Sequence, residues 1–139
     1  GWRCAVIPNY LSQLPEFLAV FAMGALLQAL YWSVYTAITP QRELDLIWSG
    51  NVAAAVMMGG AMLGYAIPLL AAMASSRELM GLAQWGAVAL VVQLAAYLIL
   101  RVLHRDLTRA IEEGRLSVAI WAATMSVVAG LINAGAILA

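Results

Sequence analysis

The chain has 139 residues, of which 65% are hydrophobic and 10% are charged, and its mean hydropathy is +0.91. Soluble domains carry roughly 25% charged residues, and a chain this short has too little interior to bury so much apolar surface. The formal net charge is zero and every basic residue is Arg, which is not the basic balance of a nucleic-acid-binding protein. The sequence therefore predicts an all-α integral membrane protein.

The first transmembrane helix is predicted over residues 17–37, a charge-free run of the length that a bilayer requires. Residues 1–14 precede it and are expected to form an irregular or short interfacial lead-in. Tyr31, Trp32 and Tyr35 gather near its far end, a pattern typical of an aromatic belt at the membrane surface. Small residues that would let another helix approach closely recur at every fourth position: Ala25, Ala29, Ser33 and Ala37.

A short interfacial helix is expected to follow. Thr39 and Pro40 are good residues for its N-cap and first helical position, and Glu43 suits the positive end of the helix dipole. Its apolar face would hold Leu44, Ile47 and Trp48. Gly50 would end this helix, and Asn51 would cap the next one.

The second transmembrane helix is predicted over residues 52–74, and it is rich in glycine. Gly60 and Gly64 form the G-x-x-x-G pattern of closely packed membrane helices. The candidate helix-packing residues on this span are Ala55, Gly59, Gly60, Gly64 and Pro68.

The second half of the chain follows the same plan. Residues 82–100 are the third predicted span, residues 101–114 a second amphipathic interfacial helix, and residues 116–138 the fourth span. The fourth span carries another row of small candidate packing residues: Ala122, Ser126, Gly130 and Ala134.

This recurrence predicts two tandem, parallel repeats within a single membrane domain of residues 1–139. The repeats cover about residues 15–75 and 79–139, and each has two spans joined by an interfacial helix on the cytoplasmic side. Shifting the chain by 64 residues places Ile47 on Ile111 and Gly50 on Gly114. Each repeat crosses the membrane twice, so both have the same orientation.

Arginine residues predict the topology. Five of them would lie on the side of the two interfacial helices: Arg42, Arg101, Arg105, Arg109 and Arg115. Arg3 and Arg77 would lie on the opposite side. The positive-inside rule then places the interfacial helices in the cytoplasm and both termini in the periplasm.

Three segments carry a resemblance to a known family: TPQRELDLIWSGNVAAAVMMGGAMLGYAIPL, WGAVALVVQL and IEEGRLSVAIWAATMSVVAGLINAGAI. From about Leu18 onward the chain resembles the YjfL-like family of bacterial inner-membrane proteins, catalogued as domain of unknown function 350. The resemblance implies four transmembrane helices in two tandem repeats. It also implies an envelope setting, because some members are encoded near proteins that resemble envelope-stress factors. It carries over no functional residues.

No catalytic, metal or cofactor site is expected. The predicted spans contain no Asp, Glu, Arg or His, the residues that mark proton relays and ion paths within membranes. Cys4 and His104 are single examples of their residue types, too few to build a zinc site. The chain is therefore predicted not to be an enzyme.

Uncharged polar residues within the spans are open to two interpretations. Gln28, Asn51, Gln93 and Asn133 could form hydrogen bonds between helices, or they could line a polar path or a ligand cavity. Similarly, Arg42, Arg101, Arg105 and Arg109 are candidates for binding lipid headgroups.

The leading hypothesis is a non-enzymatic structural or accessory subunit that self-associates or joins a larger membrane assembly, with no cofactor and with membrane lipid around it. One alternative is a small channel or transporter with an amide-lined path. Another is a lipid or quinone binder.

Overall fold

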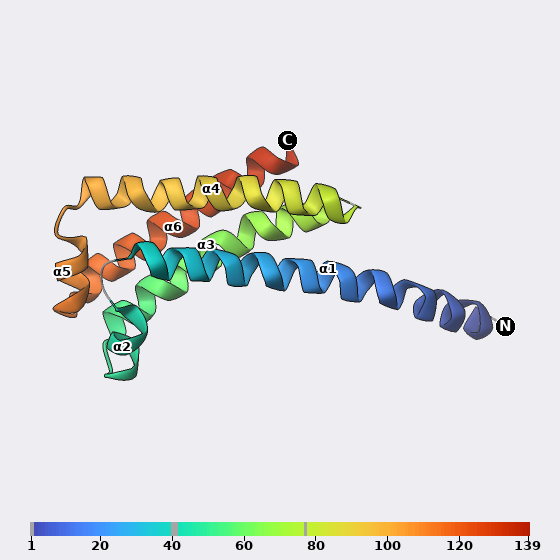
Figure 1. Ribbon diagram of the computed structural model, residues 1–139, viewed down its shortest axis with the longest axis horizontal. Helices are drawn as coiled ribbons and strands as arrows, with labels where there is room; N and C mark the ends of the chain where they lie inside the picture. Colours follow the sequence, from blue (N-terminus) through green and yellow to red (C-terminus); the bar gives the residue numbers. More distant parts are fainter. Residues whose placement is uncertain (1, 40–41, 77) are drawn as a thin grey trace.

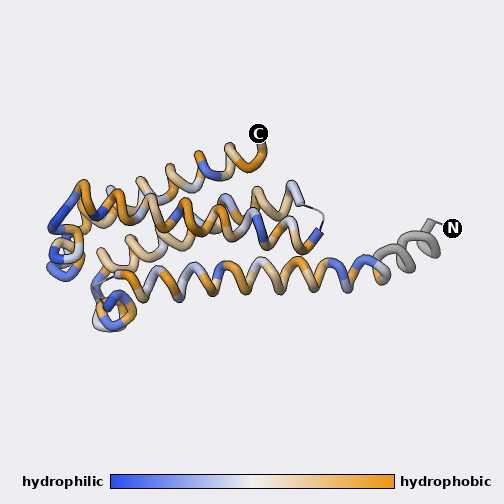
Figure 2. The backbone as a smooth tube through the Cα atoms, turned by 45° about the horizontal axis from the view of Figure 1, so that its top comes forward, coloured by the Kyte–Doolittle hydropathy of each residue, from blue (hydrophilic) through white to orange (hydrophobic). Residues whose placement is uncertain are grey.

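The computed structural model describes residues 2–39, 42–76 and 78–139, with side chains from residue 11 onward, and its ordered elements there are all helices. There are six of them: α1 (Trp2–Ile38), α2 (Glu43–Trp48), α3 (Val52–Ser75), α4 (Leu79–Leu103), α5 (Leu107–Glu112) and α6 (Leu116–Leu138). The short helices α2 and α5 lie at one end of the molecule (Figure 1). Hydrophilic segments gather at that same end (Figure 2).

Four helices are long and apolar enough to cross a membrane, and they match the four predicted spans. α6 begins and ends within a residue of the prediction. α3 is one residue longer than predicted, and α4 extends three residues further at each end. The helices are longer than the predicted spans, so that Arg101 lies in the last turn of α4 and Glu16 lies within α1, before the first predicted span begins.

The expected irregular or short interfacial lead-in over residues 1–14 is helical from Trp2, as part of α1, so the irregular alternative was wrong. Extending an existing helix adds one hydrogen bond per residue and avoids the cost of nucleation. The helix continues through Pro8 and Asn9 without interruption.

The predicted starts of the interfacial helices also need correction. α2 begins at Glu43 with Arg42 as its N-cap residue, and no side chain caps it. The Thr39 hydroxyl instead donates to the Thr36 carbonyl at 3.2 Å, at the end of α1, and Pro40 lies outside the described residues. Residues 101–114 are not one helix: α4 continues to Leu103, and α5 starts at Leu107.

α2 and α5 end in the same way. Gly50 and Gly114 have φ angles of 97° and 76°, values that glycine adopts without strain. In each turn the glycine amide donates to the carbonyl three residues back, and the next amide donates to the carbonyl five residues back, at 2.8 to 3.0 Å. This is the Schellman motif. Asn51 then caps α3 as predicted, because its side chain accepts from the Ala54 amide at 3.0 Å.

The pair formed by α3 and α6 is the centre of the bundle and by far its most extensive contact. A Cβ added to Gly60 would overlap Ala123 of α6, and one added to Gly130 would overlap the Gly64 carbonyl. The two backbones therefore approach as closely as glycine permits. α4 packs against α3, α6 and α1, and α1 packs against α3 and α4 (Figure 1).

Candidate functional site

Four buried tyrosines form a connected cluster between α1, α3 and α4. The Tyr31 ring stacks on Tyr65 with centroids 4.7 Å apart and lies 6.0 Å from Tyr35. Tyr35 in turn meets Tyr97 edge to face at 5.1 Å. Tyr31 and Tyr35 are 1% and 0% exposed, so their interpretation as part of an aromatic belt at the membrane surface was wrong.

The carboxylate of Glu43 lies at the α2 end of this cluster. The Tyr35 hydroxyl donates to Glu43 Oε1 at 3.0 Å. Glu43 is only 3% exposed. Burying a carboxylate costs several kcal/mol unless hydrogen bonds replace its hydration. The tyrosine hydroxyl supplies one such bond, and α2 starts at this glutamate, so α2 is tied to the end of α1.

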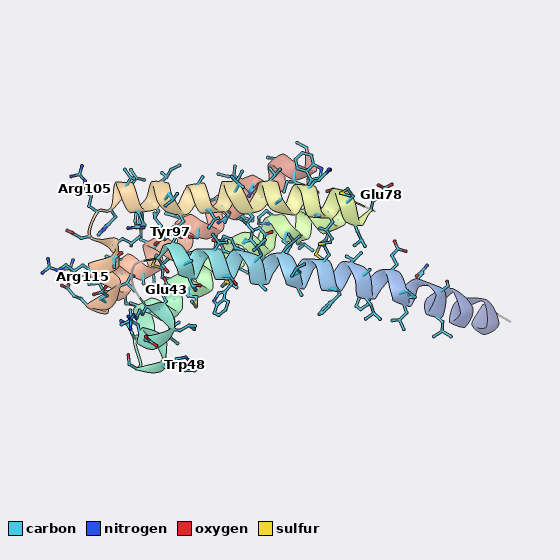
Figure 3. The ribbon with its side chains drawn as sticks, viewed as in Figure 1. Glu43, Trp48, Glu78, Tyr97, Arg105 and Arg115 are labelled. Atoms are coloured by element: carbon cyan, nitrogen blue, oxygen red, sulfur yellow. The ribbon has the colours of Figure 1, made fainter. Side chains whose placement is uncertain are left out.

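Tyr97 and Arg101 complete the cluster from α4, and Figure 3 places Tyr97 near Glu43 at the α2 end. Arg101 Nη1 donates to the Ile38 carbonyl at 3.3 Å, so the guanidinium caps the last turn of α1. The buried Tyr97 hydroxyl has no hydrogen-bond partner with good geometry among the described residues. It lies within electrostatic reach of both Arg101 and Glu43. Of the proposed headgroup arginines, Arg101 is therefore used within the fold.

A small hollow of about 180 Å³ opens beside the Glu43 carboxylate. Thr36, Thr39, Arg42, Glu43 and Asp45 contribute to its lining. Its size is sufficient for several water molecules. The Glu43 end of the tyrosine–glutamate cluster therefore lies beside a hollow that opens at the surface.

Sequence reasoning missed Glu43, because a Glu in the first turn of a helix is the expected complement to the helix dipole. A usable signal was the four tyrosines in the largely apolar spans: Tyr31, Tyr35, Tyr65 and Tyr97. A buried tyrosine hydroxyl requires a polar partner, and a carboxylate near the end of a neighbouring span can provide it.

The four candidate polar residues do not converge on one path. Each donates its side-chain amide to a backbone carbonyl of another helix: Gln28 to Met62 at 3.2 Å, Asn51 to Ile111 at 2.8 Å, Gln93 to Ser126 at 2.9 Å and Asn133 to Ala89 at 3.1 Å. These bonds tie α1 to α3, α3 to α5, and α4 to α6. Gln93 also leaves its buried Oε1 without a partner among the described residues.

Two of these bonds occur at matching positions of the two halves. Gln28 bonds from α1 to the Met62 carbonyl of α3, and Gln93 bonds from α4 to the Ser126 carbonyl of α6. Met62 and Ser126 are related by the 64-residue shift, and the two glutamines differ from it by one residue. The first and third helices of each half are thus held by the same kind of bond.

The candidate packing residues fall into two groups. Those buried or in close contact within the bundle are Gly60, Gly64, Pro68, Ala122, Ser126, Gly130 and Ala134. Ala55 and Gly59 face outward instead, and a Cβ at Gly59 would have no neighbour within 4 Å.

The remaining candidate arginines are exposed at the α2 and α5 end. Arg42 and Arg105 lie on its surface, and Figure 3 labels Arg105 there. Arg109 pairs with Glu113 at 3.2 Å, as the i,i+4 spacing predicts, and Arg115 approaches the same glutamate at 3.4 Å. No group of three His, Cys, Asp or Glu suitable for a metal ion occurs among the described residues.

The comparisons with known proteins agree with this architecture. The family model described as "Domain of Unknown Function (DUF350)" matches residues 9–137. The chain belongs to the DUF350 family. It is 30% identical over 126 residues to the UPF0719 inner membrane protein YjfL of Escherichia coli strain K12, covering 91% of this chain and 96% of that protein, and equally to YjfL of strain O157:H7. No solved structure matches.

The DUF350 match confirms the family resemblance inferred from the three sequence segments. It spans all four long helices, and the YjfL proteins that match over nearly their whole length are named as inner membrane proteins. This DUF350 chain is accordingly a multi-pass protein of the inner membrane.

Proposed function

We propose that this DUF350 protein is a non-enzymatic structural or accessory subunit that self-associates or joins a larger assembly in the inner membrane. The observation that carries the proposal is the use of the intramembrane amides. Gln28, Gln93 and Asn133 donate to backbone carbonyls of neighbouring helices. Such bonds contribute about 0.6 to 2 kcal/mol each to helix association, so these amides support a role in helix packing.

Exposed small residues support self-association. Ala25, Ala29 and Ser33 are exposed on α1. Small residues on a membrane helix allow a second helix to approach closely enough for strong van der Waals contact. By the family resemblance, the assembly belongs to an envelope-stress setting.

The architecture in this proposal is two tandem parallel repeats, about residues 15–75 and 79–139, each with an interfacial helix on the cytoplasmic side. Three matching features support it: the Schellman turns at Gly50 and Gly114, the glutamine bonds between first and third helices, and the shared order of a long, a short and a long helix. The gathering of five arginines at the α2 and α5 end supports cytoplasmic placement of that end and periplasmic termini.

The oligomeric state tests this function directly. The full chain is purified in a mild detergent and inserted into lipid nanodiscs, and its mass is measured by native mass spectrometry and light scattering. A defined oligomer or a stable complex is expected. A monomer in every mild detergent and in nanodiscs would refute the proposal.

A second candidate, a small channel or transporter, is favoured by the burial of Glu43. Buried ionisable groups beside a cavity are candidate functional groups, and the Glu43 carboxylate combines a Tyr35 hydrogen bond with a hollow that opens at the α2 end. Proteoliposome flux assays with protons, ions and small solutes would discriminate the two. Flux that the Glu43→Gln variant abolishes would favour the channel, and no flux for any solute would exclude it.

A further inference from the structure

An apolar groove runs between α4 and α6 on the outside of the bundle. It consists of two hollows of about 160 and 390 Å³ that share Ala129. The larger hollow also includes Trp85 and Ile132, and the smaller includes Ile99 and Met125. Ile132 is 69% exposed and Ile99 60%, so no helix of the same copy covers this groove.

The groove has a counterpart within the same chain. The 64-residue shift relates α4 and α6 to α1 and α3, and these two helices also form a groove. α4 occupies that groove: Tyr97 packs on Tyr35 of α1, and the Tyr65 hydroxyl of α3 donates to the Gly86 carbonyl at 2.9 Å. Arg101 of α4 also bonds to the last turn of α1.

Burial differs between the two grooves. Pro68 and Ala72 of α3 are buried, whereas Ile132 and Ala136, the residues at matching positions of α6, are exposed. The structure thus fills the first groove and leaves the second open. The first groove is filled by α4, which is the first helix of the following repeat. The second groove would correspondingly be filled by the first helix of a further repeat, and in a second copy of the chain that helix is α1.

The α1 helix of the same copy is not available for this role, because it packs against α3 and α4. Its outer face is open, however. Ala22, Leu26, Ala29 and Ser33 are exposed, and they stand 64 residues before Gly86, Leu90, Gln93 and Tyr97, four residues that are buried on α4. α1 and α4 also run in the same direction (Figure 1). An α1 helix from a second copy would therefore enter the groove without reversing its orientation in the membrane.

We propose that the α4/α6 groove binds the outer face of α1 from a second copy of this chain. The contact continues the interface inside the chain, where α4 already lies between α1 and α3. It is a head-to-tail contact, since the groove of one copy receives the helix of the next, and such contacts build rings or open chains. This inference rests on the proposed self-association and assigns its interface.

Disulfide cross-linking in native membranes tests this interface. In a Cys4→Ser background, Ala29→Cys is placed on a chain with one affinity tag and Ala129→Cys on a chain with another, and the two are co-expressed and oxidised with copper phenanthroline. Ala25→Cys and Ser33→Cys scan the same face of α1. Gly59→Cys is the matched control, because it is equally outward-facing on α3 but lies away from the groove.

We expect mixed-tag dimers from at least one α1 position with Ala129→Cys, at several times the yield of the Gly59→Cys control. An equal yield from the control would overturn the interface, because it would indicate random collision. A defined oligomer without any α1 cross-link would also overturn it while leaving self-association intact. A monomer would refute both this interface and self-association, and lipid would then fill the groove.

A steric test is independent of cross-linking. Ala29→Trp and Ala129→Trp each add bulk to a surface of the proposed contact, and Ala29 is exposed in a single copy. Overpacking of about 1–3 kcal/mol corresponds to a dissociation constant about 5- to 160-fold weaker. Unchanged association of both variants, with the fold intact by circular dichroism, would contradict the proposal.

Discussion

The contact between Gly64 and α6 gives the sharpest test of the fold. A Cβ added at Gly64 would lie 2.6 Å from the Ser126 carbonyl oxygen and 2.7 Å from Gln93 Nε2. These two atoms form the 2.9 Å hydrogen bond that joins α4 to α6. The Gly64→Ala variant must therefore separate α3 from α6 or break this bond.

The expected cost follows from three contributions. Overpacking costs about 1–3 kcal/mol, and loss of an interhelical bond in a membrane costs about 0.6 kcal/mol and at most about 1.7. Alanine is better than glycine within a helix by about 1 kcal/mol. Gly64→Ala should therefore lower the free energy of unfolding by about 1–3 kcal/mol.

Gly59→Ala is the matched control. It lies on the same helix and gains the same helix propensity, but its Cβ would have no neighbour within 4 Å. Unfolding is measured by titration with sodium dodecyl sulphate in mixed micelles, with tryptophan fluorescence and circular dichroism as signals. The two variants should differ by about 2–4 kcal/mol. If Gly64→Ala is as stable as Gly59→Ala, the close packing of α3 on α6 is wrong.

Three further predictions use the same unfolding assay. Tyr35→Phe should lower the free energy of unfolding by about 1–3 kcal/mol, because it removes a donor from the buried Glu43 carboxylate. The loss should be smaller in a Glu43→Gln background. Equal losses in both backgrounds would argue against this hydrogen bond. Gly114→Ala should cost about 1–2 kcal/mol because of its φ of 76°, and Gly114→Asn should cost less, so equal stability of the two would exclude backbone strain as the cause. Asn51→Asp should keep the cap of α3 and lose the bond to the Ile111 carbonyl. Asn51→Ala should lose both interactions and be less stable than Asn51→Asp by about 1 kcal/mol. Equal stability of the two variants would contradict the capping role.

The helices could be predicted from sequence, since the length and apolarity of a span are set directly by the bilayer. The predicted positions of the helix ends were less accurate. Nothing in the local sequence indicates that α1 extends back to Trp2, or that Arg42 rather than Thr39 precedes α2. Helix ends depend on small differences in capping energy, which tertiary contacts readily outweigh.

The packing partners were only partly predictable. The pattern Gly60-x-x-x-Gly64 indicated a close helix contact, but not that α6 of the same copy provides it. Glu43 was missed because its burial depends on the turn that brings it back to Tyr35 and on the packing of α2 against α3, which residue spacing does not encode. The partners of Gln28 and Gln93 are backbone carbonyls, which carry no sequence signature at all.

The glycine contact at the centre of the bundle has a consequence for biogenesis. Gly64 and Gly130 lie in different halves of the chain, so the contact cannot form until α6 has left the ribosome and entered the bilayer. Until then, the first half must wait in the membrane with the glycine surface of α3 facing lipid or an insertase. Synthesis order and final packing are thereby coupled, and a chain that stops before α6 should be a substrate for membrane quality-control proteases.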